Sequence, residues 1–397
     1  MATATPIKNP GSFESPRSLK IVLIAFSILG AGVFLIGLKL DPTRTWISFL
    51  LNHFYFMSLA LGGVFFAALQ WATGAMWSAP VRRASESFAS YLPVVAVSFA
   101  ILYFGIHILY LWSDTSKVQN DIILVGKAGY LSTAFFMVRN FIAIGIWIFM
   151  GGRMIKNSLA QDAQGDYSLT LKNRFLAPPF LILFALTYTM ASFDLLMSLD
   201  PYWFSTIFGI YCFAGLFYAN LAATCLLILF LKSKGKLEGL VNENHLHDLG
   251  KLMFAFTVFW AYIAFSQFML IWYANLPEET GYFLKRFHGG WFWVSAFLLV
   301  GKFIVPFFVL LTRDAKRNPA VLAPIAAFML VAQWVDILWM IQPEFFKDGP
   351  KIGLTEVGVT LGFLGVFGLL VSRFLARYNL VAIKDPRLTE SVFHHHQ

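Results

Sequence analysis

The sequence is poor in charged residues. Of its 397 residues only 13% are charged, whereas 58% are hydrophobic and 17% are aromatic. Soluble domains carry about 25% charged residues, so this composition excludes an ordinary soluble protein and indicates one that lies in a membrane. The net charge of +9 would suggest nucleic acid in a soluble protein, but here the lysines and arginines fall in short segments between apolar runs. Such residues orient membrane helices, so we expect no nucleic-acid partner.

Cysteine is equally scarce, and this excludes two kinds of redox centre. Cys212 and Cys225 fall in one apolar run, thirteen residues apart. If that run is a helix, they lie about 20 Å apart, beyond the reach of a disulfide. The sequence contains no Cys-x-x-Cys or Cys-x-x-Cys-His motif. Covalent haem and cysteine-ligated iron–sulfur clusters therefore lack ligands, and we expect no metal site and no covalently bound cofactor.

Ten apolar runs are long enough to cross a bilayer as helices, so the sequence predicts an all-α polytopic membrane protein. They lie near residues 21–40, 46–73, 88–112, 131–151, 175–198, 205–231, 252–274, 291–312, 320–341 and 354–375. An even number of spans places both termini on one side. The loops of that side, together with the tails 1–20 and 376–397, hold most of the 30 lysines and arginines. The positive-inside rule therefore predicts that both tails are cytoplasmic.

Two segments of the chain repeat one another. Each places an acid on an apolar helix, seven residues before a proline, as Asp194-Leu-Leu-Met-Ser-Leu-Asp-Pro201-Tyr-Trp-Phe204 and Asp336-Ile-Leu-Trp-Met-Ile-Gln-Pro343-Glu-Phe-Phe346. An acid within hydrocarbon costs about 2.5–3.5 kcal/mol on insertion scales, so its repetition indicates a function. We interpret the segments as the exits of two four-helix bundles, at 46–204 and 205–346. The runs 21–40 and 354–375 would then be peripheral helices.

Each predicted bundle pairs a buried acid with a base at similar depth. Asp194 shares its depth with Arg139, and Asp336 shares its depth with Lys302. Such pairing is expected because an isolated charge in a medium of low dielectric would be neutralised. Together with a histidine in the same layer, these residues form a candidate proton relay of His107, Arg139, Asp194, Lys302 and Asp336. The alternative is that the pairs only tie helices together.

Two histidines fall at matched depth in the second and third predicted helices. His53 and His107 could accept protons from the head group of a quinol, which makes them candidate ligand-binding residues. They could also be axial ligands of a b-type haem held between helices. Spacing alone does not fix the faces that the two residues present.

Three strings in the sequence carry a resemblance to a known family. They are Ser192-Phe-Asp-Leu-Leu-Met-Ser-Leu-Asp-Pro-Tyr-Trp-Phe-Ser205, Phe265-Ser-Gln-Phe-Met-Leu-Ile-Trp-Tyr-Ala-Asn-Leu-Pro-Glu-Glu-Thr280, and Lys127-Ala-Gly-Tyr-Leu131 with Arg139. Over nearly its whole length the chain resembles the F subunits of bacterial alternative complex III, which belong to the wider polysulfide reductase-type (NrfD-like) family of membrane anchors. It departs from that family at Ala128-Gly129, where an alanine–proline pair is typical.

The resemblance implies a multi-pass subunit of a quinol:cytochrome c (electron acceptor) oxidoreductase in the bacterial cytoplasmic (inner) membrane, working in respiratory or photosynthetic electron transfer. The implied partners are a homologous C-type membrane subunit, an iron–sulfur protein, haem c subunits and a small membrane subunit. Haem c and the iron–sulfur clusters would belong to those partners, and the complex would oxidise menaquinol or ubiquinol. This chain would contribute a transmembrane proton pathway or a quinol site, without a redox cofactor of its own.

Two other functions stay open. A structural anchor for periplasmic electron-transfer subunits would need the same membrane helices, with the buried acids as ties. A secondary transporter would also have repeated bundles, but its helices are typically interrupted by Gly or Pro at mid-membrane. In this chain the prolines of the repeated segments, Pro201 and Pro343, fall at predicted helix ends.

Overall fold

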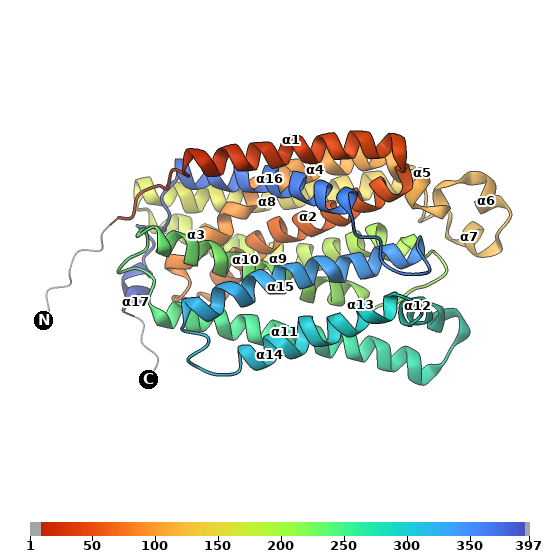
Figure 1. Cartoon of the computed structure of the whole chain (residues 1–397). Coiled ribbons are helices and arrows are strands. Elements are labelled where there is room, and N and C mark those ends of the chain that lie inside the picture. Colours follow the sequence, from red (N-terminus) through yellow and green to blue (C-terminus); the bar gives the residue numbers. More distant parts are fainter. Residues whose placement is uncertain (1–8, 394–397) are drawn as a thin grey trace, which may run out of the picture.

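The computed structural model describes residues 9–393 (Figure 1). Residues 1–8 of the predicted N-terminal tail and 394–397 of the predicted C-terminal tail lie outside the described residues. Every regular element of the described chain is a helix, and ten helical segments within it are long and apolar enough to cross a membrane. The prediction of an all-α polytopic membrane protein with ten spans is confirmed.

Eight of the ten spans are single long helices. They are α1 (Arg17–Leu40), α2 (Pro42–Thr73), α8 (Thr133–Gln164), α9 (Tyr167–Leu195), α10 (Phe208–Ser233), α11 (Glu243–Ala274), α15 (Pro319–Ile341) and α16 (Leu354–Arg377). The third span is divided into α3 (Ala79–Phe88), α4 (Leu92–Leu102) and α5 (Ile106–Leu109), joined by the 3₁₀ turns η1 (Ala89–Tyr91) and η2 (Tyr103–Gly105). The eighth comprises α13 (Trp291–Phe297), the π-helix η5 (Leu298–Ile304) and α14 (Val305–Val309).

Short helices occupy connections between spans. They are η3 (Leu111–Ser113), α6 (Thr115–Gln119), α7 (Ile122–Lys127), η4 (Met197–Leu199), α12 (Pro277–Phe287) and η6 (Gln342–Glu344). A further short helix, α17 (Leu388–Val392), follows the last span. The chain begins α1 and ends α16 at the same end of the molecule, which we call the inner end, while α6, α7 and α12 lie at the opposite, outer end (Figure 1).

The spans pack as two bundles with two further helices at one side. In the first bundle α2 packs on α3, α4 and α9, and α8 packs on α4 and α9. In the second, α10 packs on α11 and α15, and η5 with α14 contacts both of those helices. The helix α10 also packs on α2 and α9 and so joins the bundles, whereas α1 and α16 pack mainly on each other along one edge (Figure 1).

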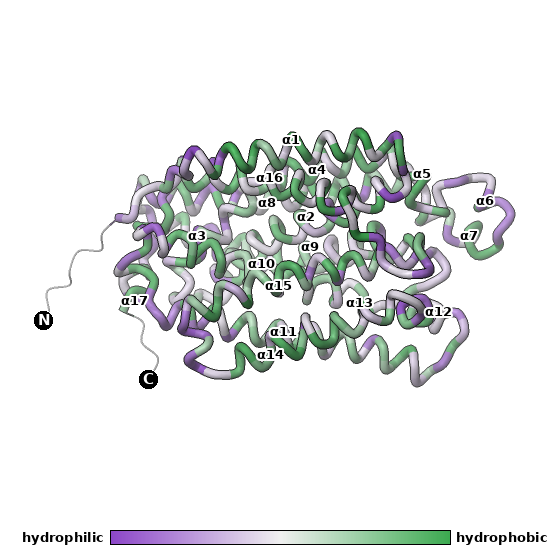
Figure 2. Tube along the Cα trace, in the orientation of Figure 1, coloured by the Kyte–Doolittle hydropathy of each residue, from purple (hydrophilic) through white to green (hydrophobic). Residues whose placement is uncertain are grey.

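The helix α2 is the centre of the molecule. Every residue from 45 to 64 is buried, so this helix has no face toward lipid over nearly six turns. A helix without a face toward lipid must be surrounded by other helices, and α3, α9, α10, α15 and α16 pack around it. The outer helices instead expose apolar side chains, such as Ile28 and Leu35 of α1 at 68% and 62%, which accords with contact with lipid. Figure 2 shows that hydrophobic residues predominate along α1.

Glycines set the distance between α1 and α16. A Cβ atom added at Gly30 would lie 2.2 Å from Cα of Gly362, and one added at Gly365 would lie 2.5 Å from the carbonyl oxygen of Leu23. Small residues at such positions let two membrane helices approach until their backbones touch, which is how helices associate where the hydrophobic effect offers no driving force.

Several helices extend beyond their apolar runs at the inner end, as α8 and α11 illustrate. The runs predicted spans near 131–151 and 252–274, whereas α8 continues to Gln164 and α11 already begins at Glu243. The side chain of Asn242 accepts from the backbone of Asn244 and so caps α11. An apolar run reports the thickness of hydrocarbon, and a polar helical turn can project beyond it.

Candidate functional site

The first buried acid is held by two side chains of α8. Arg139 donates from Nε to Oδ2 and from Nη2 to Oδ1 of Asp194, both at 2.7 Å, and Asn140 donates to Oδ2 at 2.7 Å. Asp194 is fully buried and Arg139 is 5% exposed. The guanidinium also donates to the carbonyl of Tyr130 and lies 3.7 Å from the centre of its ring. This is a bidentate pair with both partners saturated by hydrogen bonds, a geometry that fixes two helices to each other.

The second buried acid has a different set of partners. Lys302 donates from Nζ to Oδ2 of Asp336 at 2.5 Å and to Oε1 of Gln333 at 2.6 Å, and the hydroxyl of Tyr211 donates to the other oxygen of Asp336. Lys302 and Asp336 are fully buried. The ammonium group lies 4.2 Å from the ring centre of Trp260, where the face of the indole favours a cation. An amine, a carboxylate and a phenol therefore meet in one buried network.

The local backbone explains why Lys302 lies where it does. Pro306 follows it by four residues and has no N–H to donate to the carbonyl of Lys302, as a regular α-helix would require. The helix widens here into the π-helix η5, and the hydroxyl of Tyr218 approaches that carbonyl at 3.3 Å. Such π-helical turns are frequent at functional sites, because they re-aim a side chain without ending the helix.

The two histidines lie apart from both acids. His53 is buried, and its Nδ1 is 2.8 Å from Oγ of Ser98. His107 is exposed on α5, and its Nδ1 is 3.2 Å from Oγ of Ser113. Among residues 9–393 no hydrogen bond or ion pair joins either histidine to Asp194. The structure thus brings together Arg139 with Asp194 and Lys302 with Asp336, while the predicted layer that adds His53 and His107 is not connected by contacts.

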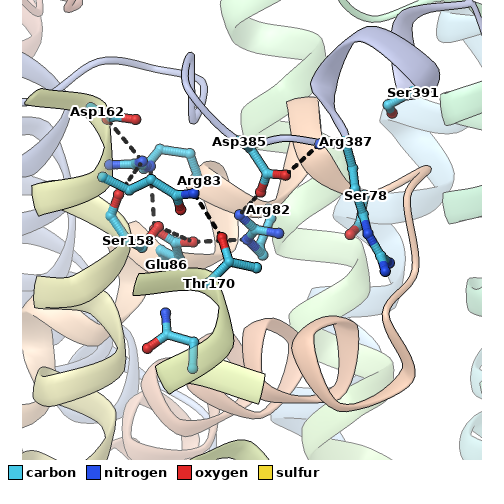
Figure 3. Close-up of polar contacts among 12 residues, drawn as sticks. Ser78, Arg82, Arg83, Glu86, Ser158, Asp162, Thr170, Asp385, Arg387 and Ser391 are labelled. Atoms are coloured by element: carbon cyan, nitrogen blue, oxygen red, sulfur yellow. Dashed lines mark hydrogen bonds and ion pairs between the residues drawn. The ribbon is translucent and has the colours of Figure 1, made fainter. Parts of the chain in front are cut away.

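A second group of buried charges lies at the inner end of the first bundle, and the sequence reasoning missed it. Arg82 contacts Glu86 at 3.1 Å and Asp385 at 2.6 Å, while Arg83 contacts Glu86 at 3.2 Å and Asp162 at 2.9 Å. Figure 3 shows both arginines of α3 directed toward Glu86, with Asp162 and Asp385 on either side. We call these five residues the inner cluster. The apolar run begins at residue 88, after both arginines, and it does not predict that the helix already starts at Ala79.

One acid of the inner cluster lies in the C-terminal segment, outside the spans. Burial alone would raise the pKa of Asp385, but the nearby guanidinium of Arg82 holds this pKa below its ordinary value. The carboxylate also accepts from the backbone N–H of Arg387 at 3.0 Å. The segment after α16 is therefore attached to α3 by a buried ion pair.

Two basic residues of α12 bind the outer ends of the repeated segments, and one of them joins both segments. Lys285 donates to Asp200 at 2.7 Å, after the first segment's helix, and to Glu344 at 2.6 Å, after the second's. Arg286 is fully buried and donates to the carbonyls of Trp339 and Met340 at 3.1 and 2.8 Å. These carbonyls belong to the last turn of α15, where a cation is favourable. Sequence reasoning placed both residues in a loop, because an arginine that caps a distant helix leaves no local pattern.

A cavity of about 430 Å³ adjoins the network of Asp336. It lies between α10, α11, α12, α13, η5 and α15, and Tyr211, Trp260 and Gln267 are among its lining residues. Nε1 of Trp260 and Nε2 of Gln267 are buried and have no hydrogen-bond partner among the described residues. A buried donor without an acceptor costs about 1–3 kcal/mol, so these two N–H groups mark a place where an acceptor would be stabilising.

No model of a known protein family matches this sequence, and no curated protein is similar to it. Within residues 9–393, no three His, Cys, Asp or Glu side chains come together as the ligands of a metal ion would. The assignment of chemistry therefore depends on the two acid–base pairs, the inner cluster and the cavity.

Proposed function

We propose that this chain is a membrane subunit of a bacterial quinol:electron acceptor oxidoreductase of the alternative complex III type, and that its second bundle moves protons. The partners would be those that the resemblance implies: a C-type membrane subunit, an iron–sulfur protein, haem c subunits and a small membrane subunit. The ten-span fold and its two bundles support this proposal, as do the acids that begin the repeated segments. Both tails would lie in the cytoplasm of the cell.

The network of Lys302, Asp336 and Tyr211 is the observation that carries the proposal. Each of these groups can hold or release a proton, and each lies within hydrogen-bond distance of the next. Arginine keeps its proton at any pH that proteins meet, whereas a buried lysine can lose it. We therefore assign the proton relay to Lys302 and Asp336 and assign Arg139 and Asp194 to holding α8 and α9 together.

The distance from the proposed relay to the outer surface is short. Glu344 follows Asp336 by eight residues, which is about 12 Å along a helix. At that level Lys285 joins Glu344 to Asp200, and the side chain of Lys285 is 39% exposed. Protons released at Asp336 would thus reach an acidic, partly hydrated group at the outer end, as oxidation of a quinol on that side requires.

A path through the whole membrane has less support. Beside the inner cluster, Gln161 donates to the hydroxyl of Thr170 at the inner end of α9. Thr170 comes 24 residues before Asp194, which is about 36 Å along the helix. Between these levels the bundles meet through aromatic rings, with Phe65 in contact with Phe184, Phe213 and Phe217. We propose proton exchange at the outer face, and the transmembrane pathway stays a prediction.

A secondary transporter is the second candidate, and the eighth span is the observation that favours it. This span is interrupted at Lys302 by η5 and Pro306, a feature that the apolar run did not predict. In typical transporters, however, unwound backbone lines the substrate site, whereas here the chain stays helical from Trp291 to Val309. The interruption positions a side chain rather than exposing carbonyls.

The test is quinol-dependent electron transfer and proton release by the purified complex that carries Asp336→Asn. Co-purification of every subunit is checked first. Asp194→Asn, which neutralises the corresponding acid of the first bundle, is the control for loss of a buried charge. Because it is expected to destabilise the protein more than Asp336→Asn does, turnover is compared per assembled complex. We expect Asp336→Asn to slow turnover and proton release by about tenfold or more, as loss of a positioned acid–base group does.

Each alternative predicts a different result. If the chain is only an anchor, Asp336→Asn changes the yield of complex but not the turnover per complex. Unchanged turnover and proton release in an intact complex would therefore refute the relay. If the chain is a transporter, electron transfer is unaffected and the variant instead stops movement of a solute across vesicles.

A further inference from the structure

The cavity beside Asp336 has the shape of a site for a flat ring. Its lining is mainly aromatic, with Phe265, Phe268, Phe283, Phe287, Phe292 and Trp339 among the walls. Phe268 contacts Phe283 and Phe287 edge-on, with ring centres 5.2 and 5.6 Å apart. Its volume of about 430 Å³ is within the range of small-molecule sites. A planar ring between such walls can form stacked or edge-on contacts on several sides.

The unpaired polar groups of the cavity are hydrogen-bond donors, so a ligand bound there would supply an acceptor. Gln267 and Trp260, 5% and 4% exposed, line it and keep buried N–H groups without a partner among the described residues. Ser295 also lines it, but its hydroxyl donates to the carbonyl of Arg286 and accepts from Trp339. The hydroxyl of Tyr211 donates to Asp336. The two free donors therefore define the chemistry: the ligand carries a carbonyl or similar oxygen.

The entrance faces the membrane rather than water. Phe265 and Phe292, at the rim, are 61% and 49% exposed on the outward surfaces of α11 and α13. The amphipathic helix α12 closes the outer end, because its Phe283 and Phe287 form part of the wall. A ligand would thus enter sideways from hydrocarbon, which excludes ions and soluble metabolites and selects an apolar molecule dissolved in the bilayer.

We propose that this cavity binds the ring of a membrane-dissolved quinone, with a ring carbonyl accepting from Gln267 or Trp260 and the isoprenoid tail leaving between α11 and α13 into the lipid. The inference rests on the proposed function, since it names the molecule whose ring would lie beside Tyr211 and Asp336. The site belongs to the second bundle and is separate from His53 and His107, which lie in the first.

The test is photolabelling of the purified complex in lipid nanodiscs with a quinone that carries an azido group on its ring. We expect the label on peptides spanning residues 260–303, and competition by unlabelled menaquinone or ubiquinone but not by excess phospholipid. Ala264→Trp places an indole in the cavity, because Ala264 is a lining residue. It should lower labelling by about tenfold, and Gln267→Leu, which removes one donor, by about fivefold.

The matched control is Gly145→Trp, which adds the same ring on an exposed position of α8, where a Cβ meets nothing within 4 Å. Labelling should be unchanged in it. Equal labelling of Gly145→Trp and the cavity variants would overturn the site, and so would competition by phospholipid, which would show a lipid in the cavity. If Ala264→Trp does not assemble, Gln267→Leu alone decides, since it keeps the size of the side chain.

Failure of this inference differs from failure of the relay. Asp336→Asn should still be labelled, because no wall of the cavity is removed. Full turnover of Asp336→Asn with specific labelling would refute the relay and leave the site. Loss of turnover in Asp336→Asn, with unaltered labelling of Ala264→Trp, would refute the site and leave the relay.

Discussion

Replacing Asp336 with asparagine leaves an ammonium group without a counter-charge in the core of the second bundle. Lys302 is fully buried, and its Nζ lies 2.5 Å from Asp336 and 2.6 Å from Gln333. In Asp336→Asn the amide oxygens still accept hydrogen bonds, but the charge is uncompensated. Breaking one partner of a buried pair in this way typically costs about 3–5 kcal/mol.

The cost has an upper limit, because the lysine can release its proton. For an ordinary lysine with a pKa of about 10.4, release at pH 7 costs about 4.6 kcal/mol. The ring of Trp260 offsets part of the remaining charge, by about 1–2 kcal/mol. We expect Asp336→Asn to destabilise the protein by about 3 kcal/mol. In the double variant Lys302→Met, Asp336→Leu no charge is left, but Tyr211 loses its acceptor and Gln333 loses its donor, at about 1 kcal/mol each.

The assay is thermal unfolding of five proteins in nanodiscs of one lipid composition. They are Asp336→Asn and the four corners of the double-mutant cycle: the unmodified protein, Lys302→Met, Asp336→Leu and the double variant. The double variant should be more stable than Asp336→Asn, although it carries one more substitution. A double variant whose loss of stability equals the sum of the two single losses would refute the reasoning, because it would show that the two groups do not interact.

Three further predictions follow from the same contacts. Asp194→Asn should destabilise the protein by about 4–5 kcal/mol, because the guanidinium beside it cannot lose its proton. A loss of stability smaller than that of Asp336→Asn in the same unfolding assay would contradict this. Gly362→Leu should separate α1 from α16 at a cost of about 1–3 kcal/mol, seen as loss of disulfide cross-linking between cysteines placed in the two helices, while Gly32→Leu, whose Cβ meets nothing within 4 Å, should keep the cross-link. Arg82 holds the pKa of Asp385 below its ordinary value, so their ion pair stabilises the C-terminal segment above about pH 4. This stabilisation is lost as the pH falls through the lowered pKa. Proteolysis of residues 378–393 should therefore increase only in acid, and in Asp385→Asn it should already be high at pH 7.

The spans were predictable because an apolar run of about twenty residues has few alternatives in a membrane. The pairing of Arg139 with Asp194 and of Lys302 with Asp336 was also foreseen, since a buried charge needs a partner at its own depth. The same reasoning did not separate the roles of the two pairs. The predicted depth of a charged residue in the membrane does not show that Gln333 and Tyr211 contact the second pair, or that the helix widens before Pro306.

Other parts of the site had no signal in the sequence. Glu86 is fully buried among two arginines that look like loop residues, because α3 starts before the apolar run does. Glu356 is fully buried and bound to Arg44 at 2.6 Å. In the sequence it lies three residues after Gly353, the spacing of an ordinary helix-capping residue, so its buried ion pair could not be predicted. The cavity is formed by residues of six helical elements between Tyr211 and Trp339, and only their packing shows that Trp260 and Gln267 lack acceptors.

Infrared difference spectroscopy of the complex, recorded between quinol-reduced and oxidised samples, tests the relay most directly. A carboxyl group that takes up a proton in turnover gives a band of the protonated acid, which moves on exchange into deuterated water. We expect this band in the unmodified complex and in the assembled Asp194→Asn complex, and we expect its loss in Asp336→Asn. A band that persists in Asp336→Asn, or that disappears only in Asp194→Asn, would contradict the assignment of proton movement to Asp336.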